Sequence, residues 1–243
     1  FPIKMVKPIT KYAKLITNPQ SLPNELIKAY TKSLTGRPGP VWLDLPLDVQ
    51  GAYIKADLNK DFKKIKSLLK RRPQFKKDKS NILKTIKLLE RSKRPLIIFG
   101  NGVKLSKSEN LVKKLIKKLK IPVLTTYSTI DLIEDNNPMY FGRPGLYGQR
   151  QANLIIQNCD LLISIGSGLH YELTGYNYKN FAKKAKRLII DIDNNELKKK
   201  NIQPNLPIRT DCSIYIKNLL KACDNKLKNF DRPKWYAYCK DLR

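Results

Sequence analysis

Between about residues 80 and 223, short apolar runs alternate with segments whose apolar residues recur at helical spacing. The run Pro95–Phe99 is followed by a segment in which Leu111, Leu115 and Leu119 would share one helix face. Further apolar runs lie at 121–125, 161–165, 188–192 and 207–209. Strands that are apolar throughout belong inside a parallel sheet, because helices cover both of its faces. The alternation therefore predicts an α/β fold, a Rossmann-like doubly wound parallel sheet.

Four stretches are predicted along the chain. Residues 80–225 form the Rossmann-like domain, and residues 1–54 belong to another α/β domain, with a helix near Asn24–Leu34. In that helix Leu26, Tyr30 and Leu34 recur on one face, and Ser21 is a candidate N-cap. Residues 55–79 are rich in lysine and are predicted to be a linker, and residues 226–243 a connector.

The segment Gly36–Gln50 combines a sharp turn with one apolar strand. Glycine reaches backbone angles that other residues avoid, and Pro38 and Pro40 fix φ and donate no hydrogen bond. Val41–Leu45 is then expected to be a buried strand of a parallel sheet, followed by Pro46.

The composition excludes several classes of protein. No apolar run approaches the roughly 18 residues of a membrane span, so no membrane partner is expected, and the first residues do not have the layout of a signal peptide. The four cysteines show no C-x-x-C pairing and there is one histidine, which argues against a zinc site and favours free thiols in the cytoplasm.

The net charge of +29 suggests a nucleic-acid partner as an alternative. Only 11 of the 49 basic residues are arginine, however, and the lysines spread over nearly every predicted helix. Specific recognition of phosphates and bases favours arginine. We therefore expect no specific nucleic-acid partner.

Ligands of an open parallel sheet bind beyond the carboxyl ends of its strands, where glycine lets backbone N–H groups approach an anion. Three glycine loops fall at such positions, Gly100–Gly102, Gly145–Gly148 and Gly166–Gly168, together with the turn after Asp191–Asp193. No complete G-x-G-x-x-G sequence opens a helix, so an NAD site is not supported. A free-standing nucleotide-binding module remains an alternative at this point.

Several segments resemble, in order, the thiamine-diphosphate enzymes of the acetolactate synthase type. Gly36–Gln50 is similar to the signature that ends the family's pyrimidine-binding domain, and Pro8–Lys11 to a segment before it. The matches to the central domain are Ile121–Thr126, Gly145–Gly148, Asn158–Gly166, Leu173–Gly175 and Ile189–Asp193. Gly148–Asn153 and Thr174–Tyr178 are similar to acetolactate synthase-like proteins of surface-polysaccharide gene sets. The likeness covers about residues 1–225.

The resemblance implies an enzyme of three sheets that uses thiamine diphosphate and magnesium to decarboxylate and ligate 2-oxo acids as a homodimer or tetramer. The catalytic glutamate of the first domain would precede Phe1, and the G-D-G motif that holds magnesium and diphosphate would follow Arg243. We therefore expect this chain alone to be inactive and to lack catalytic and metal-binding residues.

The resemblance also implies positions for a structural FAD in the central domain and for a substrate channel. The channel residue is Lys11. The FAD positions are Gly100, Asn101, Gly102, Thr126, Gly145, Gly148, Gly166, Asp191, Ile192 and Asp211. Two arginines of the family's pattern are replaced here by Gly168 and Glu172, which argues against FAD and against pyruvate as the substrate. His170 and Tyr147 receive no role.

Overall fold

The computed structural model describes residues 2–70, 75, 79–227 and 230–243. The chain divides into two compact units, residues 1–74 and residues 75–243. Among the described residues, no helix is both long enough and apolar enough to cross a membrane.

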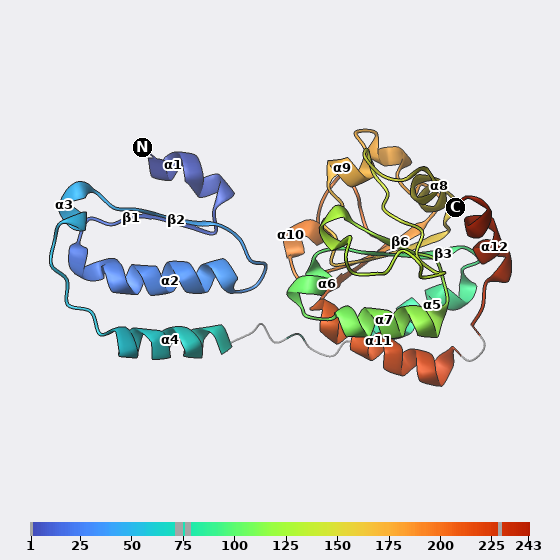
Figure 1. The fold of residues 1–243 in the computed structure, drawn as a ribbon, viewed down its shortest axis with the longest axis horizontal. Helices are drawn as coiled ribbons and strands as arrows, with labels where there is room; N and C mark the ends of the chain where they lie inside the picture. The colour runs from blue at the N-terminus through green and yellow to red at the C-terminus, as the bar shows by residue number, and fades with distance from the viewer. Residues whose placement is uncertain (1, 71–74, 76–78, 228–229) are drawn as a thin grey trace. The chain divides into compact units, whose positions relative to one another are not determined.

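The first unit is a small parallel sheet of two strands with helices (Figure 1). Its elements are α1 (Pro2–Val6), the 3-10 helices η1 (Lys7–Ile9) and η2 (Pro19–Ser21), β1 (Tyr12–Leu15), α2 (Leu22–Leu34), β2 (Val41–Asp44), α3 (Leu47–Gln50) and α4 (Leu58–Lys70). Both α1 and α2 contact the strands. The sequence predicted α2 and β2 closely. No side chain of either strand is fully buried, however, and the side chains of Leu15 and Trp42 are exposed.

The predicted linker, residues 55–79, is largely a helix. Residues 58–70 form α4, which packs on α2, and Lys64 donates a hydrogen bond to the Asn24 side chain at 3.0 Å. Polar and lysine-rich composition concealed this helix, because only one of its faces needs apolar residues. Residues 71–74 and 76–78 of the predicted linker lie outside the described part of the chain.

The second unit is the predicted doubly wound sheet, with five parallel strands in the order β4-β3-β5-β6-β7. Its strands are β3 (Pro95–Phe99), β4 (Val123–Thr125), β5 (Leu161–Ile165), β6 (Lys186–Asp191) and β7 (Leu206–Arg209). Its helices are α5 (Lys79–Arg91), α6 (Gly102–Leu105), α7 (Glu109–Leu119), η3 (Tyr127–Thr129), α8 (Arg150–Asn158), α9 (Tyr171–Thr174), η4 (Tyr178–Asn180), α10 (Asn194–Leu197), α11 (Cys212–Lys226) and α12 (Pro233–Asp241).

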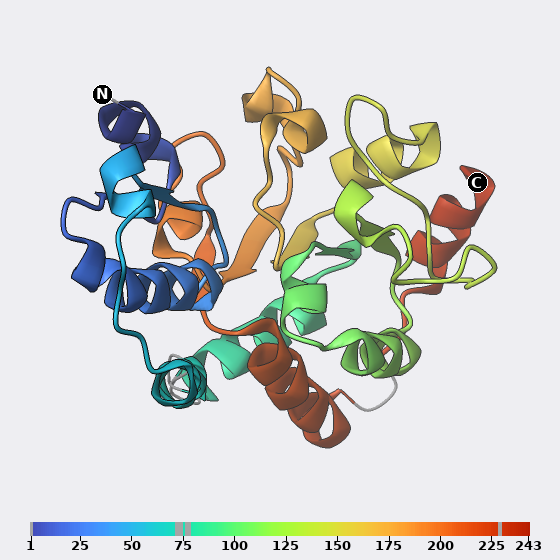
Figure 2. The ribbon, with the colours of Figure 1, turned by 60° about the vertical axis from the view of Figure 1, so that its left-hand side comes forward.

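Helices cover both faces of this sheet (Figures 1 and 2). Alternate strand residues face opposite sides. Ile97 and Ile163, which are paired in register, lie in a core with α5, α7 and α11. Leu96 and Leu162 lie in the other core, with α8 and α12. Every residue of β3 and β5 is buried, as the continuous apolar runs predicted.

The end of the chain is part of the second unit, although the sequence suggested a connector for residues 226–243. Trp235 of α12 is buried, and its indole N–H donates to the Pro95 carbonyl at 2.9 Å. The Arg232 side chain donates to the carbonyls of Leu89 and Glu90 at the end of α5. Residues 181–185, between η4 and β6, form turns that bury Phe181 and Ala182.

Buried thiols predict a loss of stability at alkaline pH. Burial raises the pKa of Cys159 from 9.0 to about 12 and that of Cys223 to about 11. A thiol whose pKa is higher in the folded than in the unfolded state makes its full contribution to stability below pH 9, the unfolded pKa. This contribution is lost as the pH rises through the folded pKa. We expect the free energy of unfolding to fall by a few kcal/mol between pH 9 and pH 12, as measured by urea denaturation.

The variant Cys159→Ala should show a shallower fall over the same range, because one of the titrating thiols is gone. An unchanged slope would contradict the assignment of the fall to this thiol.

Candidate functional site

The candidate site lies at the carboxyl edge of the five-stranded sheet. The chain leaves β3 for β4 on one side and later returns to β5 on the other, so the loops after β3 and β5 diverge at a switch point. Because all five strands are parallel, the segments that follow them meet at one edge. These segments contain seven of the predicted residues, Gly100, Asn101, Gly102, Thr126, Gly166, Ile192 and Asp211, and an eighth, Asp191, ends β6.

The loops after β3 and β5 touch at glycine residues. The N–H groups of Gly100 and Gly102 donate to the carbonyls of Ile165 and Gly166, both at 2.9 Å. A Cβ atom on Gly100 would lie 2.5 Å from the Gly166 oxygen, and one on Gly102 would lie 2.7 Å from the Gly166 Cα. These glycines therefore let two backbones approach closely.

The sulfur of Cys212 closes the same contact from the start of α11. Gly166 has φ +65°, and a Cβ atom on it would lie 2.8 Å from both the Cys212 Sγ and the Gly102 Cα. Burial, and after it the carboxylates of Asp211 and Asp191, raises the pKa of the Cys212 thiol. The thiol is therefore neutral and packs as an apolar group.

Gly145 and Gly148 belong to a separate loop between η3 and α8. Gly145 exchanges two hydrogen bonds with the Asn153 side chain, at 2.8 and 3.0 Å, and the Gly148 N–H donates to the Gly145 carbonyl. The Leu146 N–H donates to the Glu172 carbonyl at 2.7 Å, which ties this loop to α9. Like Gly100 and Gly102, these glycines use their N–H groups inside the fold.

The polar residues at the edge also have structural partners. Thr126 and Thr129 form a capping box around η3, and the Thr129 hydroxyl donates to the Phe99 carbonyl at 2.9 Å. The Asp191 carboxylate accepts the Asp193 N–H at 2.8 Å. Asp211 caps α11 by accepting the Ser213 N–H at 2.9 Å.

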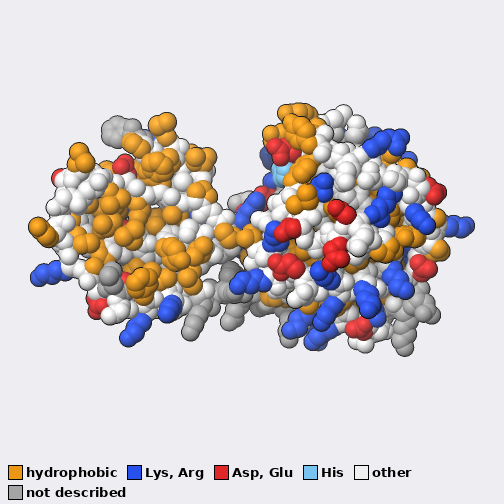
Figure 3. Space-filling model, in the orientation of Figure 1, with side chains coloured by type: hydrophobic (Ala, Val, Ile, Leu, Met, Phe, Trp, Pro, Cys, Tyr) orange, Lys and Arg blue, Asp and Glu red, His pale blue; other side chains and the backbone are white. Residues whose placement is uncertain are grey.

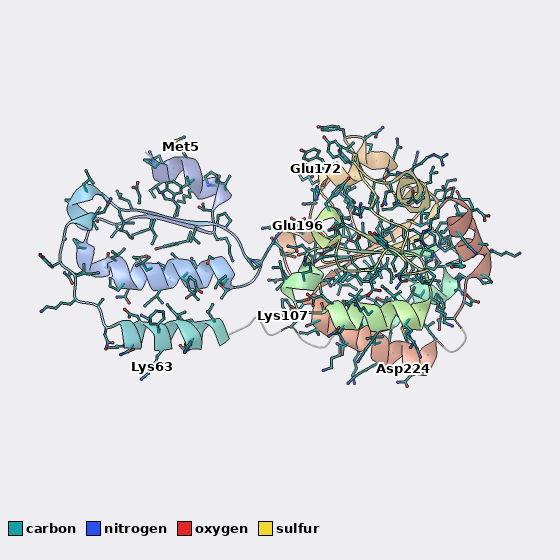
Figure 4. All side chains as sticks on the ribbon, in the orientation of Figure 1. Met5, Lys63, Lys107, Glu172, Glu196 and Asp224 are labelled. Carbon is teal, nitrogen blue, oxygen red and sulfur yellow. The ribbon has the colours of Figure 1, made fainter. Side chains whose placement is uncertain are left out.

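The loops after β3 and β5 keep some capacity to bind a ligand. Among the described residues, no acceptor is found for the N–H groups of Asn101, Ser167 and Gly168. The Lys199 ammonium donates to the Gly168 carbonyl at 2.8 Å and also pairs with Glu196, so its charge is partly neutralised. This tether, which joins the loop after β5 to the region of α10, was not predicted from the sequence (Figure 4 labels Glu196). In the sequence, the one indication of this contact is the three-residue spacing of Glu196 and Lys199, which suits an ion pair.

Lys11 lies in the first unit, between η1 and β1. Its ammonium group donates to the carbonyls of Thr35 and Arg37, at 2.5 and 2.8 Å, just after the end of α2. These hydrogen bonds tie the segment before β1 to the turn between α2 and β2.

Gly168 and Glu172, which stand where the resemblance implies arginine, both lie near the surface at the carboxyl ends of the strands. Gly168 is held by Lys199, and the Glu172 carboxylate is partly exposed with the His170 Nδ1 3.6 Å away. No group of three or more His, Cys, Asp or Glu side chains suited to a metal ion is found among the described residues. The carboxyl edge therefore carries carboxylates and backbone N–H donors. At residues 168 and 172 it lacks the arginine side chains that could bind an anion.

Comparisons with known proteins give a family for this fold. Residues 82–219 match the family described as thiamine pyrophosphate enzyme, central domain. The chain is 37% identical, over 89% of its length, to a probable acetolactate synthase large subunit of Methanococcus aeolicus. It is 35% identical over 97% of its length to a protein of the same description from Methanocaldococcus jannaschii, and 32% identical over 95% to the acetolactate synthase large subunit of Cyanidium caldarium. It spans only 36% to 39% of these relatives' length.

Replacement of Gly166 tests the contact between the loops. Gly166→Ala forces a methyl group against Cys212 and Gly102, whereas Gly36, which has the same φ of +65°, has no atom within 4 Å of the corresponding position. We expect Gly166→Ala to destabilise its unit by about 3 kcal/mol or more and Gly36→Ala to cost about 1 kcal/mol. Amide hydrogen exchange, followed separately in the two units, measures both. Equal costs would show that φ alone requires glycine at residue 166.

Proposed function

This chain belongs to the thiamine pyrophosphate enzyme family, whose central domain it contains, and we propose that it is part of an enzyme that decarboxylates and ligates 2-oxo acids. The observation that carries the proposal is the agreement of two ranges: the family match over residues 82–219 coincides with the five-stranded unit. Similarity to the large subunits of acetolactate synthases extends beyond it, over 89% to 97% of the chain.

The first unit is proposed to be the C-terminal part of the pyrimidine-binding domain. Parallel sheets are usually buried on both faces, and two-stranded sheets are marginal. In β1 and β2 every side chain is at least partly accessible, in contrast to the fully buried β3 and β5. Figure 3 shows hydrophobic side chains over much of the visible face of this unit. These features support a sheet that further strands of the enzyme complete.

The catalytic parts of the enzyme are proposed to lie outside these 243 residues. Thiamine diphosphate, held by magnesium, would supply the electron sink for loss of carbon dioxide. The described residues contain no carboxylate cluster suited to magnesium. The role of this chain is then to pack beside the catalytic domains and to position them in a homodimer or tetramer of the cytoplasm.

The central unit is proposed not to hold FAD. The N–H groups of Gly100, Gly102 and Gly148 are used inside the fold and cannot also bind a diphosphate. No arginine stands at residues 168 and 172, and Glu172 would repel phosphates. The bonded glycines and the missing arginines therefore argue against a flavin dinucleotide, whose diphosphate would find only the N–H groups of Asn101, Ser167 and Gly168.

An activity assay tests the proposed enzyme. The complete open reading frame that contains this chain should consume pyruvate or another 2-oxo acid when thiamine diphosphate and Mg²⁺ are added. The 243-residue chain alone should show no turnover under the same conditions. Turnover by the chain alone would contradict the proposed location of the catalytic parts, and the absence of thiamine-dependent turnover in the complete protein with a panel of 2-oxo acids would contradict the proposed activity.

A spectroscopic measurement tests the absence of flavin. The purified complete protein should lack the visible absorbance of a flavin, and it should leave the fluorescence of added FAD unquenched. A near-stoichiometric amount of flavin released on denaturation would refute this part of the proposal, without affecting the family assignment.

A further inference from the structure

An exposed cluster of aromatic side chains and one carboxylate lies beside α9. We name it the tyrosine patch; it consists of Tyr147, Tyr171, Tyr176 and Glu172. Tyr147 is 81% exposed, Tyr176 79% and Tyr171 53%. Figure 4 labels Glu172 at α9, and in Figure 3 hydrophobic side chains gather in the same part of the second unit, near the pale blue His170. Large aromatic residues in such exposed positions suggest a binding surface rather than packing.

The tyrosine patch is held together by contacts within and between two loops. The rings of Tyr171 and Tyr176 stack, with centroids 5.5 Å apart and planes inclined by 28°. The Tyr171 hydroxyl lies 3.5 Å from the Glu172 carboxylate. The hydrogen bond from the Leu146 N–H to the Glu172 carbonyl brings the loop of Tyr147 to the same place. The backbone thus arranges the patch in advance of any ligand.

The charges around Tyr171 agree with this geometry. Glu172, followed by Tyr176, burial and, more weakly, Tyr147, raises the pKa of the Tyr171 hydroxyl. The hydroxyl therefore stays neutral, and Glu172, which also has the His170 Nδ1 3.6 Å away, is the carboxylate of the patch. Aromatic faces attract cations through the ring quadrupole, and an adjacent carboxylate adds a direct charge attraction.

The same chain already uses this combination in its first unit. The ammonium groups of Lys28 and Lys32 lie 4.8 and 5.0 Å from the centroid of the Tyr12 ring, whose hydroxyl donates to Glu25. No such cation stands over a ring of the tyrosine patch among the described residues, although the chain carries 49 lysines and arginines. The tyrosine patch thus has the aromatic rings and the carboxylate of the arrangement at Tyr12, without its cations.

We propose that the tyrosine patch binds the organic cation of a small molecule, an alkylammonium or guanidinium group, against the exposed faces of Tyr176 and Tyr147 and beside Glu172. The net charge of +29 does not prevent this, because charges farther away than about 8 Å are screened at physiological salt. The proposal does not depend on the thiamine enzyme assignment, since it uses only the side chains of two loops.

Ligand-observed NMR titration of the 243-residue chain tests the proposal. The probes are choline and its neutral isostere 3,3-dimethylbutan-1-ol, which has the same shape without the charge. We expect choline to bind about fivefold more tightly than the alcohol. Glu172→Gln and Tyr176→Ser should each weaken choline binding about fivefold and bring it close to the alcohol. Both side chains are at the surface, so the variants should fold, and far-UV circular dichroism checks this.

Tyr53→Ser is the matched control, because Tyr53 is 99% exposed in the other unit. It should leave choline binding unchanged. Equal binding of choline and the alcohol, no detectable binding of choline, or an equal loss in Tyr53→Ser would each overturn the proposal. Analytical ultracentrifugation of the chain and of Tyr176→Ser then tests whether the patch joins two copies of the chain. A monomer–dimer equilibrium that Tyr176→Ser abolishes would show that the patch is an interface between copies, and would overturn the proposal as well.

Discussion

The second unit depends on the close contact between the loops that follow β3 and β5. Two parallel strands that are neighbours in the sheet must send their chains apart at this point, and here the backbones remain bonded to each other before they separate. Gly100, Gly102 and Gly166 allow this approach, and the sulfur of Cys212 fills the remaining space. A glycine loop at the carboxyl end of a strand is often taken as an anion site, but three of these donors are already used. Because the N–H groups of these glycines are bonded within the fold, the glycines serve the packing of the two backbones.

Charges of both signs meet at the carboxyl edge of the second unit. The segments after β5, β6 and β7 carry the carboxylates of Glu172, Glu196 and Asp211, but also lysines such as Lys198 and Lys199. Asp211 caps α11, and Glu196 pairs with Lys199. These carboxylates therefore serve local structure.

The two units differ in how far their own residues complete them. In the second unit helices pack on both faces of the sheet, and every residue of β3 and β5 is buried. Leu26, Tyr30 and Leu34, the stripe on α2, remain about half exposed, as does Trp42 of β2. Burial of such side chains is worth about 1.5 to 3 kcal/mol each, so a surface that covers them would stabilise the first unit substantially. The contrast follows from sheet size, since two strands cannot shield both faces of a layer.

The sequence by itself determined the five strands of the second unit and the family. Pro95–Phe99 and Leu161–Ile165 could be predicted with their bounds, because strands buried on both faces are nearly continuous apolar runs, interrupted here only by Ser164. Only the tertiary structure showed that α4 is a helix packed on α2 and that Trp235 belongs to the core, since lysine-rich segments hide a single buried face. It also decided that Lys11 bonds to the turn after α2, that Lys199 holds Gly168, and that Tyr147 stands with Tyr171 and Tyr176. These contacts join residues from separate loops, and no local pattern encodes where a distant carbonyl or ring will lie.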